Sequence, residues 1–330
     1  MKPHSGFLQG ASASTQCSTQ GRQRADQAKI ISASRRTDIP AFYAPWLMNR
    51  IRAGHCVYPN PVAPARFHRV SLRREDVLGF VFWTRHPAPL LPHLSELDRA
   101  GFAYYFQYTV LGYPHVIDPG SPSLDQAIRI FHVLAERGGS RRIVWRYDPI
   151  LLGCGISTDW HRGNFLRIAD AIGEDTRCLV VSVIDPYRMT HRRMGSPKDG
   201  VSCDLASYEE LLVWIAGEAE GRGLSVQSCA EPSLPLPGIS PGRCIDAALL
   251  YQLKGRPEPS ELPPHGLREG CLCHRSVDIG ANNSCGFGCQ YCYATSNHAQ
   301  ALETVQRHQA QWSCITGDVQ VDAPNSVSPR

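Results

Sequence analysis

Three cysteines, Cys285, Cys289 and Cys292, form a C-x3-C-x2-C run near the C-terminal end of the chain. Three thiolates on one short loop can each bind a different iron of a [4Fe-4S] cluster. Because the loop has no fourth thiolate, the last iron would stay open to a small-molecule ligand. The spacing favours an iron–sulfur cluster, with structural zinc and unligated or disulfide-forming thiols as the alternatives. Zinc is less favoured because it prefers two C-x2-C pairs and the loop holds only one.

Four further cysteines are expected to meet near this loop. Cys229 ends an apolar run, Cys244 follows a segment rich in proline and glycine, and Cys271 and Cys273 form a C-x-C pair. Four thiolates make one closed metal site, and such a site suits iron–sulfur and zinc alike. We hypothesise a second cluster, [4Fe-4S] or [2Fe-2S], that relays an electron or binds substrate. Structural zinc and unligated thiols are the alternatives.

The composition is that of a water-soluble enzyme. The chain has 330 residues, 42% of them hydrophobic, and no apolar run near the roughly 18 residues that span a bilayer. No secretory signal is evident and the 13 cysteines are odd in number, so we expect a reducing, cytoplasmic location and no membrane partner. The net charge of +4 is too small to indicate nucleic acid without a concentrated basic patch.

Short apolar runs alternate with segments of helical period, which is typical of a parallel sheet covered by helices. The runs span residues 30–33, 79–84, 104–110, 142–147, 179–184, 224–228 and 276–280. The helical segments span residues 90–100, 123–137, 160–171 and 208–222, with Ser123 and Asp159 as expected N-caps. This alternation predicts an α/β fold, a parallel β/α barrel or partial barrel of TIM-like type.

One barrel-like domain is predicted over residues 29–312, with the cluster loop at 285–292. Residues 1–28 and 313–330 are poor in core residues and are predicted to be a disordered extension and a disordered tail. Residues 55–72, with three prolines in their middle, predict an inserted hairpin. Residues 231–242 break the alternation after the sixth run.

In β/α barrels the chemistry collects on the loops that follow the strands. Charged residues occupy such positions after four of the runs, and they are the candidates for contacting a substrate: Arg85, Arg146, Asp148, Asp185 and Glu231. The alternative is structural, because Asp-Pro pairs initiate turns and arginine–aspartate pairs brace loops.

The cysteine loop, with the aromatic Tyr291 before its third cysteine, resembles that of the radical S-adenosylmethionine (SAM) enzymes. The resemblance implies a [4Fe-4S] cluster whose open iron binds the amino and carboxylate groups of SAM. It further implies cleavage of SAM to an adenosyl radical, hydrogen abstraction from a substrate, and a reductant such as a flavodoxin or ferredoxin. Tyr291 would pack against the cluster or the adenine, with simple loop packing as the alternative.

A broader resemblance covers residues from about 29 to 294. Its motifs are residues 31–40, 81–85, 104–107, 144–149 and 278–294, in that order. Together they resemble the bacterial domain of unknown function 1848 family, which has a radical-SAM-like cysteine loop near its C-terminus. The resemblance supports the cofactor and implies no particular substrate.

The position of the loop predicts a circularly permuted strand order. Radical SAM enzymes carry the cysteine loop after the first strand, whereas here it follows the last run. If the last strand lies beside the first, residues 34–38 approach the open iron, where those enzymes have a Gly-Gly-Glu stretch. We hypothesise that Ser34, Thr37 and Asp38 bind the SAM ammonium and that Arg35 or Arg36 binds its carboxylate.

Two classes of function follow from these motifs. The first is a radical SAM-type enzyme that acts on an unknown substrate. The second is a non-catalytic or electron-transferring iron–sulfur protein, or a structural zinc protein, on a β/α barrel. A nucleic-acid substrate, as the similarity of the cysteine spacing to photoproduct lyase suggests, would require the scattered arginine pairs to share one face.

Overall fold

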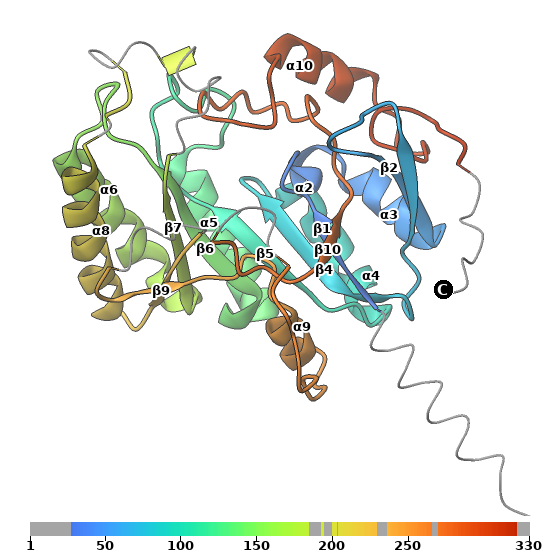
Figure 1. The fold of residues 1–330 in the computed structure, drawn as a ribbon, viewed down its shortest axis with the longest axis horizontal. Helices are drawn as coiled ribbons and strands as arrows, with labels where there is room; N and C mark the ends of the chain where they lie inside the picture. The colour runs from blue at the N-terminus through green and yellow to red at the C-terminus, as the bar shows by residue number, and fades with distance from the viewer. Residues whose placement is uncertain are drawn as a thin grey trace, which may run out of the picture.

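The computed structural model describes residues 28–184, 193–194, 200–202, 204–229, 236–265 and 270–321 (Figure 1). Two predicted substrate contacts, Asp185 and Glu231, lie outside the described residues. So do residues 1–27 and 322–330, which make up most of the predicted N-terminal extension and part of the predicted tail.

Strands and helices alternate along most of the described chain. In chain order they are β1 (Lys29–Ala33), α2 (Ile39–Phe42), α3 (Ala44–Arg52), β2 (His55–Pro59), β3 (Phe67–Ser71), β4 (Val77–Thr84), α4 (Leu94–Arg99), β5 (Tyr104–Thr109), α5 (Leu124–Gly138), β6 (Ile143–Ile150), α6 (Thr158–Ile172), β7 (Cys178–Val183), α8 (Leu205–Glu220), β8 (Ser225–Ser228), β9 (Ile239–Pro241), α9 (Ala247–Leu253), β10 (Ser276–Asp278) and α10 (His298–Arg307). The alternation confirms the predicted mixed α/β class.

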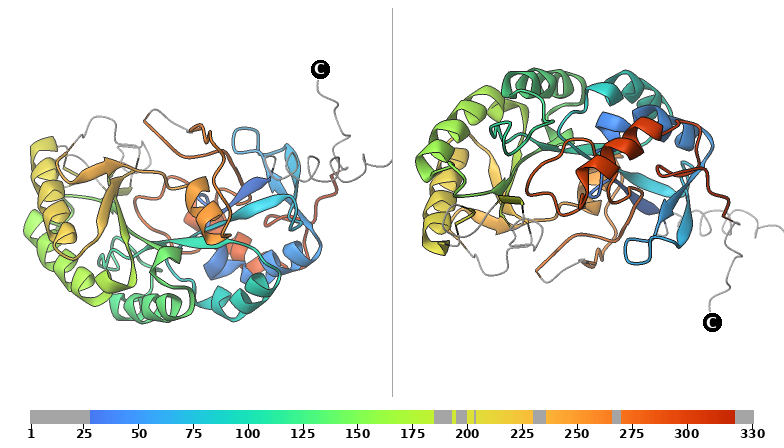
Figure 2. Two further views of the ribbon diagram at one scale, coloured as in Figure 1. Left: turned by 90° about the horizontal axis from the view of Figure 1, so that it is seen from below. Right: turned by 90° about the horizontal axis from the view of Figure 1, so that it is seen from above.

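One parallel sheet of eight strands forms the centre of the fold, in the order β10-β1-β4-β5-β6-β7-β8-β9. The sheet is curved, and α5, α6 and α8 lie along its outer side (Figure 2). Within the described residues β10 and β9 are the two ends of the strand order. What the structure establishes is therefore a large parallel sheet, and the predicted barrel closure is not part of it.

All seven predicted runs are strands of this sheet, but the sequence reasoning missed an eighth. Strand β9 falls inside the segment that was expected only to break the pattern. It has three residues, ends at Pro241 and lies at the edge of the sheet, where a proline removes no ladder hydrogen bond from a neighbour. The predicted hairpin is confirmed, since β2 and β3 pair antiparallel outside the main sheet.

The pairing of the last strand with the first agrees with the predicted order. Strand β10 runs parallel to β1, with Ile30 opposite Ser276 and Ser32 opposite Asp278. The carboxyl ends of parallel neighbours lie at the same edge of a sheet. The cysteine loop after β10 therefore emerges beside the loop after β1.

Alternate residues of each strand enter two different cores, as a sheet covered on both faces requires. Phe80 and Phe82 of β4 pack in the larger core with the helices of the outer side. Val81 and Tyr105 face the other way, into a smaller core that includes Leu250 of α9. Helix α9 accordingly lies on the side of the sheet away from α5, α6 and α8 (Figure 2). Irregular segments around Cys229, Cys244 and Cys273 also pack in or against this smaller core on the inner face.

Two helix starts test the predicted caps. Ser123 caps α5, and its side chain accepts a hydrogen bond from the Gln126 amide, as predicted. Asp159 is not the cap of α6, because Ser157 takes that role by accepting from the Trp160 amide at 3.1 Å. The helix begins at Thr158, two residues before the segment predicted from the apolar pattern. Asp159 therefore lies in its first turn, where a carboxylate complements the helix dipole.

Packing contacts continue past the residue expected to end the domain. The Ser313 carbonyl accepts a hydrogen bond from the Val57 amide of β2 at 2.9 Å, and Cys314 and Ile315 are fully buried. In the described part of the chain no helix is long and apolar enough to span a membrane.

A buried histidine makes the stability of the fold depend on pH. The His161 Nδ1 accepts from the Tyr147 hydroxyl at 2.8 Å, and its Nε2 donates to the Leu151 carbonyl at 2.9 Å. Burial lowers the pKa of His161 to about 4, against 6.5 for the ordinary group, although the Leu151 carbonyl opposes the shift. The folded state therefore holds this ring neutral, whereas the unfolded chain takes up a proton below pH 6.5.

We expect this ring to cost the fold roughly 2 kcal/mol of unfolding free energy between pH 7 and pH 5. The loss begins as pH falls through 6.5 and ends near pH 4, where the folded state is protonated too. Guanidinium unfolding of the wild type and of His161→Gln at both pH values measures it. The variant should lose about 2 kcal/mol less than the wild type over this interval. Equal losses in the two proteins would show that His161 is not the responsible group.

Candidate functional site

The end of β10 approaches the end of β1 so closely that a side chain is excluded. A Cβ atom on Gly280 would lie 2.0 Å from the Ser34 Oγ and 3.1 Å from the Thr37 Cγ2. Only glycine allows this approach. The close contact holds the start of the cysteine loop against residues 34–37.

Asp278, the last residue of β10, gathers most of the polar groups that follow β1. Its carboxylate accepts hydrogen bonds from the Ser32 Oγ at 2.8 Å, the Ser34 Oγ at 2.7 Å and the Arg35 amide at 2.8 Å. The Arg36 Nε donates to it at 3.2 Å. Burial alone would raise the pKa of Asp278, but the Arg36 and Arg35 charges outweigh it and hold the pKa below its ordinary value.

Three of the predicted SAM contacts are part of this network. Ser34, Arg35 and Arg36 all contact Asp278, and Arg36 also donates to the carbonyls of Asp278 and Pro59. The sequence reasoning did not identify Asp278 as a site residue. The available signal was a carboxylate at the end of a strand expected to lie beside two arginines.

Asp38 and Thr37 sit on the side of this network nearer the cysteines. The Asp38 carboxylate caps α2 by accepting from the Ala41 amide at 2.9 Å, and it accepts from the Arg85 amide at 2.7 Å. Burial raises the pKa of Asp38 to about 7, although these hydrogen bonds oppose the shift. The Thr37 Oγ1 is buried and has no hydrogen-bond partner in the structure. An unpartnered buried hydroxyl is costly unless a ligand satisfies it.

The cysteine loop is held in place by the segment before α5. The Gly120 amide donates to the Phe287 carbonyl at 2.9 Å, and the Gln290 amide donates to the Ile117 carbonyl at 3.0 Å. A Cβ atom on Gly120 would lie 2.6 Å from the Phe287 carbonyl oxygen, so this approach also requires glycine. From the other side the Tyr43 hydroxyl donates to the Ser284 carbonyl. The loop is thereby fixed by contacts that are distant in sequence.

The three loop thiols lie near one another; Cys289 is buried, and Cys285 and Cys292 are partly exposed. Burial raises the pKa of Cys289, and the neighbouring Cys292 and Cys285 raise it further. Burial likewise raises the pKa of Cys285 to about 12, with Asp38 acting in the same direction. Taken as free thiols, Cys285 and Cys289 would stay protonated near neutrality, so a bound cation is needed to hold these two as thiolates.

No group of three histidine, cysteine, aspartate or glutamate side chains in the described ranges converges closely enough to hold one metal ion. Three thiolates on a single zinc ion lie about 3.8 Å apart, given Zn–S bonds of about 2.3 Å. Ligands of a [4Fe-4S] cluster bind different irons and lie further apart. As the described loop stands, its three thiols are not arranged around one ion. A cluster would bind each thiolate to a different iron.

The positively charged Arg85 side chain lies beside the cysteine loop. Its Nη1 donates to the Asp118 Oδ2 at 2.7 Å, and its Nη2 donates to the Tyr291 hydroxyl. Burial would lower the pKa of Arg85, but the neighbouring Asp118 carboxylate raises it well above the ordinary value. The Asp118 Oδ1 is buried without a partner. Asp118, like Asp278, was not predicted, and its loop position carries no sequence signal.

Tyr291 packs among protein groups at the inner side of the loop. Its hydroxyl donates to the Asp118 Oδ2 at 2.9 Å, and its ring lies 5.5 Å from the Arg85 guanidinium and 6.1 Å from the Tyr113 ring. Arg85, Asp118 and Tyr113 also line a cavity of about 220 Å³ beyond the end of β5. The predicted substrate contact Arg85 is thus close to the loop and to a cavity.

Arg146 and Asp148, also predicted to contact substrate, contact each other on the inner face of the sheet. The Arg146 Nε donates to the Asp148 Oδ2 at 2.9 Å, its Nη1 donates to the Gln107 Oε1 at 3.1 Å, and its side chain is 4% exposed. The guanidinium lies 5.0 Å from the Trp83 ring, whose Nε1 is buried without a partner. The Ser182 hydroxyl donates to Asp148. Asp148 keeps more access to solvent than Arg146.

The four cysteines predicted to form a second site also come together. The Cys244 Sγ lies 3.2 Å from the Cys229 Sγ, and Cys273 interacts through its side chain with both Cys244 and Cys271. They lie on the inner face of the sheet, in or against the smaller core.

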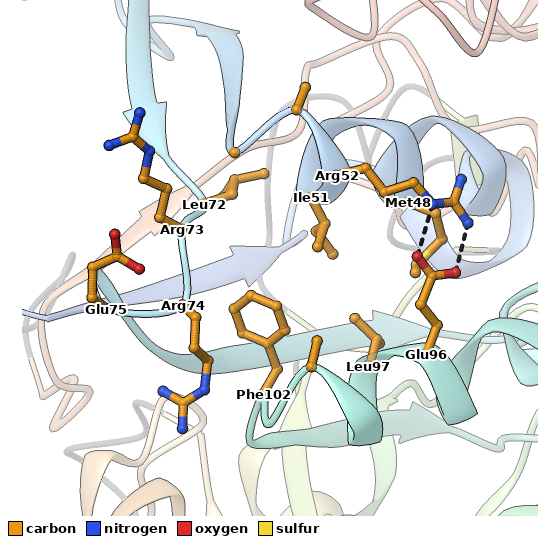
Figure 3. Close-up of a pocket in the computed structure, with 13 residues that line it drawn as sticks. Met48, Ile51, Arg52, Leu72, Arg73, Arg74, Glu75, Glu96, Leu97 and Phe102 are labelled. Carbon is orange, nitrogen blue, oxygen red and sulfur yellow. Dashed lines mark hydrogen bonds and ion pairs between the residues drawn. The ribbon is translucent and has the colours of Figure 1, made fainter.

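A cavity of about 420 Å³ lies away from all these groups (Figure 3). It has an apolar floor that includes Leu72, Leu97 and Phe102, and an Arg52–Glu96 ion pair of 2.6 Å crosses one side. Its lining precedes β4 and β5, so it opens at the amino ends of the strands. The cysteine loop lies at their carboxyl ends, so this cavity is not part of the candidate site.

The comparisons with known proteins identify a family and supply no activity. No match was found among curated proteins or among solved structures. The sequence profile of one family, described as Domain of unknown function (DUF1848), matches residues 30–294. This match covers most of the chain, from β1 through the cysteine loop. The protein therefore belongs to the Domain of unknown function (DUF1848) family.

Proposed function

We propose that this protein is an iron–sulfur enzyme of radical SAM type that acts on a substrate yet to be identified. A [4Fe-4S] cluster would be held by Cys285, Cys289 and Cys292, with SAM at its open iron. The observation that carries the proposal is the grouping of these three thiols at the carboxyl end of β10, beside the loop after β1. When reduced, a bound cluster supplies one electron to SAM, and a flavodoxin or ferredoxin would supply that electron.

The surroundings of the thiols suit a cluster. Phe287 and Cys289 are buried, and the Phe287 ring packs 4.7 Å from that of Phe42. This packing covers one side of the loop. Arg85 places its charge next to Cys289, which favours the thiolate over the thiol. The chain thus places the Arg85 guanidinium, which is paired with Asp118, beside the buried Cys289 of the proposed cluster site.

On the SAM side, the contacts favour Thr37 over the other predicted residues. Thr37 has an unpartnered buried hydroxyl, whereas Ser34, Arg35 and Arg36 already contact Asp278. Both Asp38 carboxylate oxygens accept backbone amides, and each keeps a second lone pair. In this proposal Thr37 contacts the SAM amino acid group directly, with Asp38 as an additional acceptor. The arginines orient the loop through Asp278.

The substrate would lie over the inner face at the carboxyl ends of the strands. Asp148 is the partly exposed acceptor there, and the Trp83 ring, whose Nε1 is unpartnered, lies 5.0 Å from the Arg146 guanidinium that pairs with it. Arg146 is buried and paired with Asp148, so its proposed role is to hold that carboxylate rather than to touch the substrate. Electron transfer without SAM cleavage is the competing function.

The proposal is tested by anaerobic reconstitution and EPR of the reduced protein with and without SAM. We expect a cluster signal that changes when SAM is added. Thr37→Val should keep its iron and weaken SAM binding about tenfold, since a hydrogen bond to a charged group contributes about 1.5 kcal/mol. Thr158→Val, at the start of α6, is the matched control and should bind SAM like the wild type.

The outcomes separate the competing functions. A cluster EPR signal that does not change when SAM is added would favour an electron-transfer or structural role and would overturn the enzyme proposal. If the protein took up no iron at all, the loop cysteines would be assigned to a zinc site or to free thiols. A normal SAM affinity in Thr37→Val would leave the cluster assignment standing and would exclude this residue from the SAM contacts.

A further inference from the structure

We propose that Cys229, Cys244, Cys271 and Cys273 form a second, four-thiolate metal centre, separate from the cysteine loop. The four thiols are in contact in series. Cys244 donates to the Cys229 Sγ at 3.2 Å, Cys273 interacts with Cys244, and Cys271 interacts with Cys273. Four cysteines brought into contact from distant parts of a chain are the ligand set of a closed zinc or iron–sulfur site.

A metal at these thiols would link three segments of the chain that lie apart in the sequence. Cys229 follows β8, Cys244 precedes α9, and the C-x-C pair precedes β10. The described residues between α9 and β10 contain neither helix nor strand, yet they cover the inner face of the sheet. A metal bound to all four thiolates would join these three segments.

Arg146 and a backbone amide donate to two of the sulfurs, and the same contacts would serve thiolates once a metal is bound. The Arg146 Nη1 donates to the Cys244 Sγ at 3.0 Å, and its charge also acts on Cys229. The Ile245 amide donates to the Cys273 Sγ at 3.4 Å. By contrast, the Cys154 Sγ donates to a backbone carbonyl, as a thiol does. Four thiolates around a divalent ion carry a net charge of about −2, so a buried arginine beside them is a fitting counter-ion.

The backbone around Cys244 is fixed independently of any metal. Its carbonyl accepts from the Tyr105 hydroxyl at 2.8 Å and from the Gln107 Nε2 at 2.9 Å. Both donors project from β5 on the inner face of the sheet. Cys244 and Cys273 are 3% and 5% exposed, whereas Cys229 and Cys271 are partly exposed. Cys244 and Cys273, the two buried thiols, therefore form the more rigid half of the site.

The four sulfurs must move closer together before one metal centre can bind all of them. In the described structure no three of these side chains surround a single point. The outer thiols, Cys229 and Cys271, have room to turn inward by rotation about χ1, because they are the partly exposed pair. Zinc and iron–sulfur clusters share this ligand set, and metal analysis distinguishes them.

The test removes the loop cysteines first, so that only the second centre can bind metal. The background variant is Cys285→Ala/Cys289→Ala/Cys292→Ala, purified anaerobically and analysed for zinc, iron and acid-labile sulfide. We expect it to retain either about one zinc without sulfide or about two to four irons with matching sulfide. Adding Cys244→Ser and Cys271→Ser should lower that metal content at least tenfold.

Two controls keep the result interpretable. Cys56→Ala, a buried thiol in β2 outside both sites, should leave the metal of the background variant unchanged. If Cys244→Ser does not fold, Cys271→Ser alone and a thiol-accessibility assay with and without a chelator replace it. A folded background variant that takes up neither zinc nor iron would overturn the proposal. So would full metal retention without Cys244 and Cys271, or a Cys229–Cys244 disulfide in the purified protein.

Discussion

Replacing Cys289 with serine is expected to remove the [4Fe-4S] cluster, a loss of about four irons per chain. Cys289 is the middle ligand, is 9% exposed, and lies beside both Cys285 and Cys292 and the Arg85 charge. A serine oxygen is a poor substitute for thiolate at iron, and two remaining thiolates leave two irons of the cluster without protein ligands. Iron and sulfide analysis after anaerobic reconstitution measures the loss, and the SAM-dependent EPR change should vanish with it.

The matched control is Cys56→Ala, because Cys56 is also buried and no candidate site includes it. Its iron content should equal that of the wild type. Any iron that remains in Cys289→Ser should depend on Cys244 and Cys271, as the second centre predicts. Full iron content in Cys289→Ser, with Cys244 and Cys271 intact or replaced, would contradict the assignment of the loop as the cluster site.

Replacing Asp278 with asparagine is expected to lower the free energy of unfolding by about 3 kcal/mol. The carboxylate accepts from two serine hydroxyls and the Arg35 amide, and it faces the buried Arg36 at 3.2 Å. Without it the Arg36 guanidinium stays buried without a charged partner, which costs far more than the ion pair itself contributes. Urea unfolding at pH 7 measures the change as a lower midpoint with the same slope.

Asp125→Asn is the control for this prediction. Asp125 pairs with Arg167 at 2.6 Å, but both side chains are more than half exposed. Such a pair contributes only about 0–1 kcal/mol. The double variant Asp278→Asn/Arg36→Met should recover part of the loss, because it removes the unpaired charge as well. An Asp278→Asn protein as stable as Asp125→Asn would show that the network after β1 is not held by this carboxylate.

The Asp278 variant also distinguishes stability from cofactor binding. Asp278 contacts none of the loop cysteines directly, but it fixes the strand end from which the loop starts. If the protein remains folded, it should take up iron more slowly and bind SAM less tightly. This pattern is expected from a positioning residue, and it differs from the loss of iron in Cys289→Ser.

Local sequence patterns were sufficient for seven strands of the sheet, for the helices α4, α5, α6 and α8, and for the cysteine loop, but not for α2, α3, α9 and α10. The apolar runs of β4 and β5 predict buried strands because both faces of a covered parallel sheet are apolar. The C-x3-C-x2-C spacing is a property of one loop, so it could be read without any fold. The pairing of β10 with β1 was also predictable, from the late position of that loop. The short edge strand β9 was missed because three residues carry no period.

The roles of the residues after β1 were decided only by the tertiary structure. Ser34, Arg35 and Arg36 look like ligand contacts in sequence because they are polar and follow a strand. They contact Asp278 because the register of β10 and β1 brings together residues about 240 positions apart. No local pattern encodes such a register. The same reason explains why Thr37 is the unpartnered hydroxyl and why Arg85 meets Asp118. The sequence determined which chemical groups are present, and the packing of distant segments determined which remain free to bind a ligand.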